Sequence, residues 1–162
     1  MIVVCDTSAI TNLAAVEHLH LLEALYDEVI IPEAVFRELV DAPQPVPGAS
    51  EAEDFGWIKV KAVTNTELVE QLGNSLDAGE AEAIALAVEL RAGLLVLDER
   101  TGHWIATNLK LRVIGILGVL LAAKANGLIP AVQPLLDRLI GQAGFWVSRA
   151  VYRRVLQLAQ ED

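Results

Sequence analysis

The sequence is poor in cysteine, and its one cysteine is Cys5. No disulfide can therefore form within the chain, and a single thiol is typical of a reducing compartment. Cys5 precedes Asp6, but no histidine is placed by the sequence to activate it as a nucleophile. A cysteine inside an apolar stretch is usually just buried, so we do not expect thiol catalysis.

Basic residues are also few: 12 Lys and Arg oppose 22 Asp and Glu, for a formal net charge of −10. This balance argues against broad, non-specific electrostatic binding to DNA or RNA. It leaves nucleic acid open as a partner, because clustered carboxylates can bind a divalent metal that meets phosphate. The best basic patch is Arg149, Arg153 and Arg154. A solvated helix face is its default interpretation, with RNA contact and partner docking as alternatives.

Long hydrophobic runs are missing. The most apolar late stretch, residues 116–123, is far shorter than the roughly 20 residues of a membrane helix. The N-terminus has no basic region ahead of an apolar stretch, so we expect no secretory signal. We therefore expect a soluble, cytoplasmic protein with no membrane partner.

Hydrophobic residues make up 54% of the chain, and their spacing predicts alternating strands and helices. Continuously apolar or β-branched runs predict strands at 2–5, 28–32, 94–97 and 112–115, with a more exposed strand at 57–63. Helical spacing covers 7–26 (two short helices), 33–40, 75–93, 101–111, 116–127, 132–142 and 148–162, and 41–50 is expected to be a loop. This pattern predicts one domain over 1–162: an α/β fold with three α/β/α layers, a mostly parallel sheet of about four to five strands, and extra C-terminal helices.

Two of the predicted strands end in an acid. The run "IVVC" is followed by Asp6, and "LLVL" is followed by Asp98. In open parallel α/β sheets, sites lie beyond the carboxyl ends of strands where the strand order reverses, so these carboxylates are candidate metal ligands. Each could instead be the N-cap of the next helix.

Two further acids come from predicted helices. Glu38 borders the buried face of the helix at 33–40, and a solvated helix glutamate is the alternative. Glu80 has capping-box spacing with Asp77, so capping is the alternative there. Glu82 points to a different side of the same helix, so Glu80 and Glu82 are not expected to be equal ligands.

Four carboxylates from four elements suit metal-assisted hydrolysis. Mg²⁺ and Mn²⁺ prefer carboxylate and water oxygens, and either ion polarises a phosphoryl oxygen and generates hydroxide near neutral pH. Carboxylates crowded without a cation would repel one another, which raises some of their pKa values. A bound cation is therefore expected.

With these residues the sequence resembles the PIN-domain ribonucleases, and more closely their DUF3368 branch, over nearly the whole chain. The resemblance rests on "VVCDTSAITNLAAVEHLHLLEALYDEVIIPEAVFREL", "LDAGEAEAIALAVEL", "LLVLDERTGHWIATNLKLRVIGILGVLLAAKANGLI" and "VQPLLDRL". It implies a Mg²⁺- or Mn²⁺-dependent endoribonuclease, a hydrolase of RNA phosphodiester bonds, often the toxin of a type II toxin–antitoxin pair.

Residue by residue, the resemblance implies four catalytic and metal-binding acids: Asp6, Glu38, Glu80 and Asp98. Thr7 or Ser8 matches the hydroxyl that supports the first acid. Many PIN domains have aspartate as the third of these acids, where this chain has Glu80. Which of Glu80, Glu82 and Asp77 faces the metal therefore stays open. Arg100 is a candidate contact to a substrate phosphate, with a surface salt bridge as the alternative. Trp104 is expected to pack rather than to stack on a base.

The expected partners are an RNA substrate, a small antitoxin protein and a second copy of the chain. A homodimer is expected because the apolar helices of the second half exceed what a small sheet must bury, and PIN-like proteins commonly dimerise. The alternative function is a catalytically silent PIN-like module that binds a partner protein or RNA. A phosphotransfer enzyme with Asp6 as nucleophile is disfavoured, because "DTS" lacks a second acid at i+2.

Overall fold

The computed structural model describes residues 1–162 and contains one five-stranded sheet in the order β3-β2-β1-β4-β5. Every neighbouring pair of strands is parallel. The strands are β1 (Val3–Cys5), β2 (Val29–Pro32), β3 (Ile58–Lys61), β4 (Leu94–Val96) and β5 (Val113–Ile114). The predicted parallel α/β sheet is confirmed, and all five strands lie within or at the predicted apolar runs.

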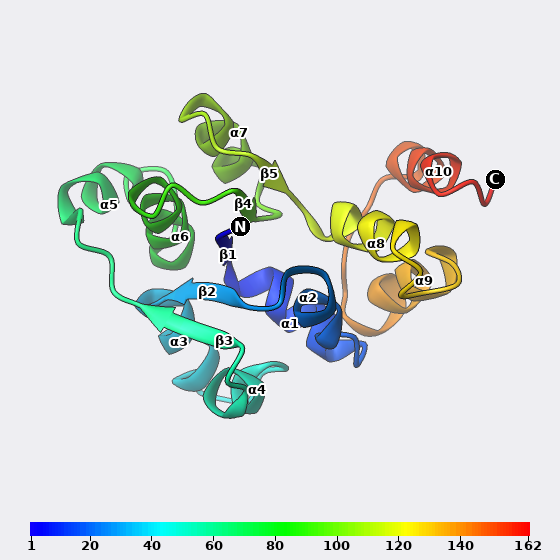
Figure 1. Ribbon diagram of the computed structural model, residues 1–162, viewed down its shortest axis with the longest axis horizontal. Coiled ribbons are helices and arrows are strands. Elements are labelled where there is room, and N and C mark those ends of the chain that lie inside the picture. Colours follow the sequence, from blue (N-terminus) through cyan, green and yellow to red (C-terminus); the bar gives the residue numbers. More distant parts are fainter.

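Ten helices surround the sheet (Figure 1). They are α1 (Thr7–Ala15), α2 (His20–Tyr26), α3 (Glu33–Val40), α4 (Ala49–Asp54), α5 (Thr66–Leu72), α6 (Ala78–Glu89), α7 (Arg100–Asn108), α8 (Ile116–Ala125), α9 (Gln133–Gln142) and α10 (Arg149–Leu158). No helix is both long and apolar enough to span a membrane.

Two apolar clusters, one on each face of the sheet, give the fold its three layers. Val3 and Cys5 of β1 join the larger cluster, to which helices α1–α4 and α8–α10 contribute. Val4, between them, points the other way into a smaller cluster with α5, α6 and α7. This alternation follows from the period of two along a strand, and it explains why the central strands are apolar throughout.

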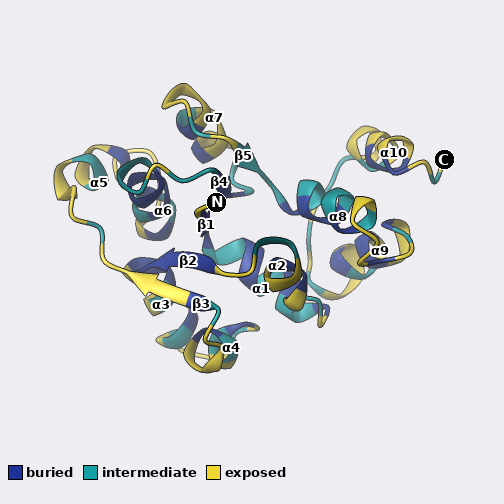
Figure 2. Cartoon of the chain, in the orientation of Figure 1, coloured by how far each residue is buried: buried dark blue, intermediate teal, exposed yellow.

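The structure departs from the sequence prediction in two short helices. The segment 41–50 was expected to be a loop, but α4 begins at Ala49, and α5 was not predicted. Each buries one side chain, Ala52 in α4 and Leu72 in α5, so neither has the apolar periodicity that marks a longer helix. Figure 2 shows β2 buried and most of edge strand β3 exposed, as expected.

The strand order places the two acid-bearing strands side by side. The chain moves from β1 to β2 and β3 on one side of the sheet, and β4 and β5 lie on the other. The β1–β4 boundary is therefore the point where the strand order reverses. Cys5 pairs with Val96, and the Asp6 N–H donates to the Val96 carbonyl at 3.0 Å. Both strands thus end level; Asp6 follows β1 directly, and Asp98 follows β4 after Leu97.

Candidate metal centre

A pocket of about 510 Å³ lies at the carboxyl ends of β1 and β4. Its lining contains six carboxylates and no Lys, Arg or His: Asp6, Glu38, Asp77, Glu80, Asp98 and Glu99. Hydroxyl and amide groups of α1 add to its polar wall: Thr7, Ser8, Thr11 and Asn12. The fold therefore brings together all four acids that the sequence selected, in a lining that has no positive side chain.

Asp6 is the most buried of these acids, with 4% of its surface exposed. Its backbone has extended N-cap geometry at the start of α1, but its side chain makes no capping hydrogen bond. Oδ1 is buried with no hydrogen-bond partner. Burial raises the pKa of Asp6 from 3.8 to about 7, and a backbone hydrogen bond from Thr7 partly opposes this rise. The negative charges of nearby acids raise the pKa further; they belong to Glu80, Asp77 and Glu38. The capping alternative therefore fails for this side chain.

Asp98 does not cap the helix that follows it. Glu99 is the N-cap of α7, and its side chain accepts from Gly102 N–H. Asp98 Oδ1 instead accepts from the N–H of Ile116, the first residue of α8, at 3.0 Å, while Oδ2 is buried without a partner. Burial raises the pKa of Asp98, and the Ile116 hydrogen bond and His103 oppose the rise. The hydrogen bond to Oδ1 therefore fixes the Asp98 side chain, and Oδ2 has no hydrogen-bond partner.

Glu38 is held by two neighbouring helices, although the residue itself is exposed. Its Oε2 accepts from the Thr7 hydroxyl at 2.5 Å, and its Oε1 accepts from Gly79 N–H at 3.0 Å. A β-carbon at position 79 would lie 2.6 Å from Oε1, so glycine is needed for this approach. The Thr7 hydroxyl therefore supports Glu38 and not Asp6, and Glu38 is not a freely solvated glutamate.

Glu80 and Asp77 form the capping box of α6. The Asp77 side chain accepts from Glu80 N–H at 2.8 Å, and Glu80 Oε2 accepts from Asp77 N–H at 3.2 Å. Both side chains also line the pocket, and burial raises the pKa of Glu80. Asp77 and Glu80 therefore cap the helix and line the pocket at the same time. A carboxylate can do both because it has two oxygens.

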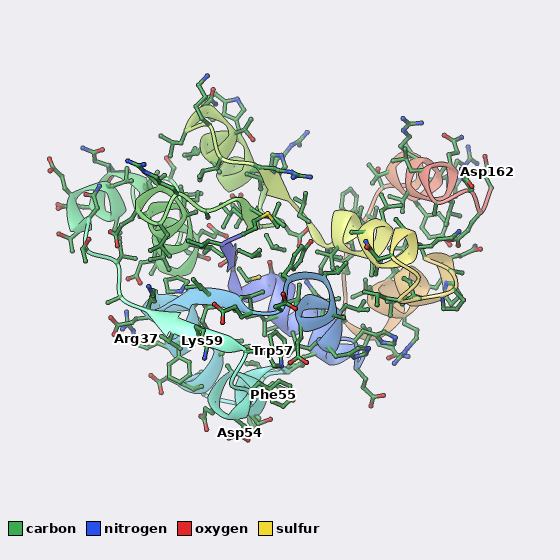
Figure 3. All side chains as sticks on the ribbon, viewed as in Figure 1. Arg37, Asp54, Phe55, Trp57, Lys59 and Asp162 are labelled. Carbon is green, nitrogen blue, oxygen red and sulfur yellow. The ribbon has the colours of Figure 1, made fainter.

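Glu82 turns away from the pocket. Its Oε1 accepts from Ala34 N–H at 3.0 Å, and its Oε2 lies 3.8 Å from Arg37 Nη2. Figure 3 shows Arg37 on the α3 side of the molecule. Glu82 thus satisfies the first turn of α3, and of the two glutamates Glu80 is the one that lines the pocket.

The remaining candidates divide between the pocket and the surface. Ser8 lines the pocket, whereas Arg100 is exposed and is not part of the lining. Trp104 was expected to pack, but 68% of its surface is exposed, because α7 presents it to solvent. Sequence reasoning missed Glu99 and Trp146 at the pocket, and no local pattern marks either residue.

The donor set fits a hard divalent cation. Six carboxylates share one pocket without a cationic side chain, and two of them have a buried oxygen with no partner. Such oxygens are the ligands that Mg²⁺ and Mn²⁺ prefer. No group of three or more His, Cys, Asp or Glu side chains already converges as a ligand set. The hydrogen bonds of Glu38 and Glu80 explain this, because these carboxylates are engaged elsewhere.

Comparison with known proteins identifies the family of the chain. The chain matches the DUF3368 family, described as a PIN domain, over residues 2–161. No curated protein matches it. PIN domains have a nuclease-type fold, are generally nucleases and typically depend on divalent metal. Because the match covers nearly the whole chain, the protein belongs to the DUF3368 family of PIN domains.

Proposed function

We propose that the protein is a metal-dependent endoribonuclease that hydrolyses RNA phosphodiester bonds. One observation carries the proposal: adjacent strand ends bring Asp6 and Asp98, each with one buried and unpartnered carboxylate oxygen, to the lining of a pocket of six carboxylates. Leaving carboxylate oxygens buried without a partner is costly unless a cation binds them. Such a cation would in turn attract the phosphate of a substrate.

Each acid has a distinct part in the proposed reaction. Asp6 and Asp98 would hold Mg²⁺ or Mn²⁺, since each has a free oxygen. A bound ion would supply Lewis-acid chemistry there, through polarisation of a phosphoryl oxygen and a lower pKa for the water that would act as nucleophile. Glu38 and Glu80 would complete the ligand set or orient the attacking water by hydrogen bonds. Thr7 keeps the Glu38 carboxylate in position.

The biological setting that we propose is the toxin of a type II toxin–antitoxin pair that acts as a homodimer in the cytoplasm. The PIN-domain family supports the nuclease part of this setting. Exposed apolar side chains on α10 support a protein contact, because Val151 is 43% and Leu158 is 52% exposed. A small antitoxin and a second copy of the chain are the partners that we propose.

A catalytically silent binding module is the second candidate. It is favoured by the hydrogen bonds that engage Glu38 and Glu80, and by the lack of a converged set of three ligands. A module of this kind would bind RNA or a partner protein without cutting RNA.

RNA cleavage separates the two candidates. Purified protein is incubated with single-stranded RNA and Mg²⁺ or Mn²⁺, alongside Asp6→Asn, Asp98→Asn and a control, Asp54→Asn. Asp54 is exposed at the end of α4 and does not line the pocket. We expect both pocket variants to lose roughly 100-fold or more in rate, since several kcal/mol of transition-state stabilisation depend on the metal. Full activity in both variants would refute the proposal, and RNA binding without cleavage by the wild type would support the module.

A further inference from the structure

An exposed tryptophan stands at the rim of the acidic pocket. Trp146 lies in the linker between α9 and α10, lines the pocket, and has 81% of its surface exposed. It is more exposed than any other large hydrophobic side chain of the protein. An indole left in water forfeits the stabilisation of burial, so its place beside a polar pocket indicates that it contacts a ligand.

The linker is held in place next to Trp146. Gly144 has a φ of +72°, which favours glycine, and the Phe145 N–H donates to the Leu139 carbonyl of α9 at 3.0 Å. The Phe145 ring packs against the larger apolar cluster. Phe145 therefore anchors the linker to the core, and the exposure of Trp146 is a property of a fixed segment.

The chain around Trp146 carries a charge opposite to that of the rest of the protein. Residues 143–158 include three arginines and no acid, within a chain of net charge −10. Arg149, Arg153 and Arg154 are exposed, and the two salt bridges of the protein involve other residues. An exposed aromatic ring followed by unpaired arginines is the combination that binds single-stranded nucleic acid, by base stacking and phosphate contact.

We propose that Trp146 stacks on an unpaired base of an RNA strand whose phosphate enters the acidic pocket. The strand must be unpaired where it meets Trp146, because bases in a duplex are already stacked and paired. This inference rests on the proposed ribonuclease function. A protein partner seated on Trp146 fits less well, since it would remove water from the pocket carboxylates.

Binding is measured with a labelled unstructured oligoribonucleotide, using Asp98→Asn protein to prevent cleavage. Trp146→Ala, Trp146→Phe and Trp104→Ala are each added to this background. Trp104 is the matched control, because it is 68% exposed but lies outside the pocket lining. We expect Trp146→Ala to weaken binding about 10-fold, a typical loss for one base–aromatic stack. Trp146→Phe should retain most of the affinity, and Trp104→Ala should change nothing.

Three further measurements separate stacking from a structural role. A duplex of the same sequence should bind weakly, with an affinity that Trp146→Ala leaves unchanged. In the active protein, Trp146→Ala should raise KM about 10-fold with little change in kcat, because the stack is present before and during the reaction. Quenching of indole fluorescence by RNA should disappear in Trp146→Phe and persist in Trp104→Ala.

Unchanged single-strand affinity in Trp146→Ala would overturn the inference, whether or not the protein cleaves RNA. An equal loss of single-strand and duplex binding would also overturn it, because stacking is selective for unpaired bases. So would a Trp146→Ala protein that binds RNA normally but changes its oligomeric state, which would assign the residue to a protein contact. If the wild type cleaves nothing but binds single strands through Trp146, the stacking role stands and only the nuclease proposal fails.

Discussion

Replacing Asp6 by asparagine should flatten the pH dependence of stability in the metal-free protein. Burial, with the neighbouring acids, raises the pKa of Asp6 from 3.8 to about 7 in the folded state. The folded protein therefore holds this proton more tightly than the unfolded chain does. The resulting stabilisation is fully present below pH 3.8 and is lost as the pH rises to about 7. Asparagine has no such proton.

The size of the effect follows from the pH interval. Between about pH 4.5 and pH 7, each pH unit lowers the free energy of unfolding by about 1.4 kcal/mol through Asp6. Over this interval the ionisation of Asp6 should therefore lower the free energy of unfolding by about 3 kcal/mol. Burying the asparagine amide without a partner costs about 1–3 kcal/mol, but this cost is similar at both pH values. The cost of the buried amide therefore cancels when the pH-induced change in unfolding free energy is compared between the wild type and Asp6→Asn.

Urea unfolding with a chelator present, at about pH 4.5 and pH 7.5, measures the difference. The unfolding free energy of the wild type should fall by about 3 kcal/mol more than that of Asp6→Asn over this interval. The control Asp54→Asn should behave as the wild type does. Figure 3 shows Asp54 at the outer end of α4. Parallel pH curves for the wild type and Asp6→Asn would refute the reasoning. Mn²⁺ added at pH 7.5 should restore stability to the wild type and not to Asp6→Asn.

Three substitutions test other contacts of the pocket. Gly79→Ala places a β-carbon 2.6 Å from Glu38 Oε1, so the Glu38 carboxylate must move away from Gly79 N–H; this should lower RNA cleavage and cost about 1 kcal/mol of stability. Gly141→Ala lies in α9 and meets open space, so it should leave cleavage unchanged and should not lower stability, because alanine favours a helix more than glycine does. Thr7→Val removes the hydroxyl that donates to Glu38 and should cost about 1 kcal/mol in urea unfolding; unchanged stability and activity would count against that bond. Glu82→Gln should lower the unfolding free energy by up to about 1 kcal/mol, because Glu82 accepts a hydrogen bond from the first turn of α3. It should leave the Mn²⁺ affinity measured by calorimetry unchanged, and a loss of affinity would place Glu82 in the site.

Sequence reasoning selected Asp6 and Asp98 because each depends on a local pattern, and the structure places both in the lining of the pocket. An apolar run that ends in Asp6 or Asp98 marks the carboxyl end of a buried strand, and parallel strands bring such ends to one edge. The strand order, with β1 and β4 as neighbours, agrees with that reasoning. The capping box at Asp77 was likewise visible as residue spacing and is present in the structure.

The contacts that the sequence did not reveal join distant segments. Asp98 accepts from Ile116, 18 residues later, and Glu82 accepts from Ala34, 48 residues earlier. No periodicity encodes such partners, because they depend on how helices pack on the sheet. The same holds for Trp146, which reaches the pocket only through the path of the linker after α9.

The central claim is that the pocket at the ends of β1 and β4 binds a divalent cation through Asp6 and Asp98. Isothermal titration of Mn²⁺ into the wild type and into the Asp6→Asn/Asp98→Asn double variant tests it most directly. We predict saturable binding to the wild type and none to the double variant at millimolar metal. Equal binding by both proteins, or no binding by the wild type, would contradict the claim.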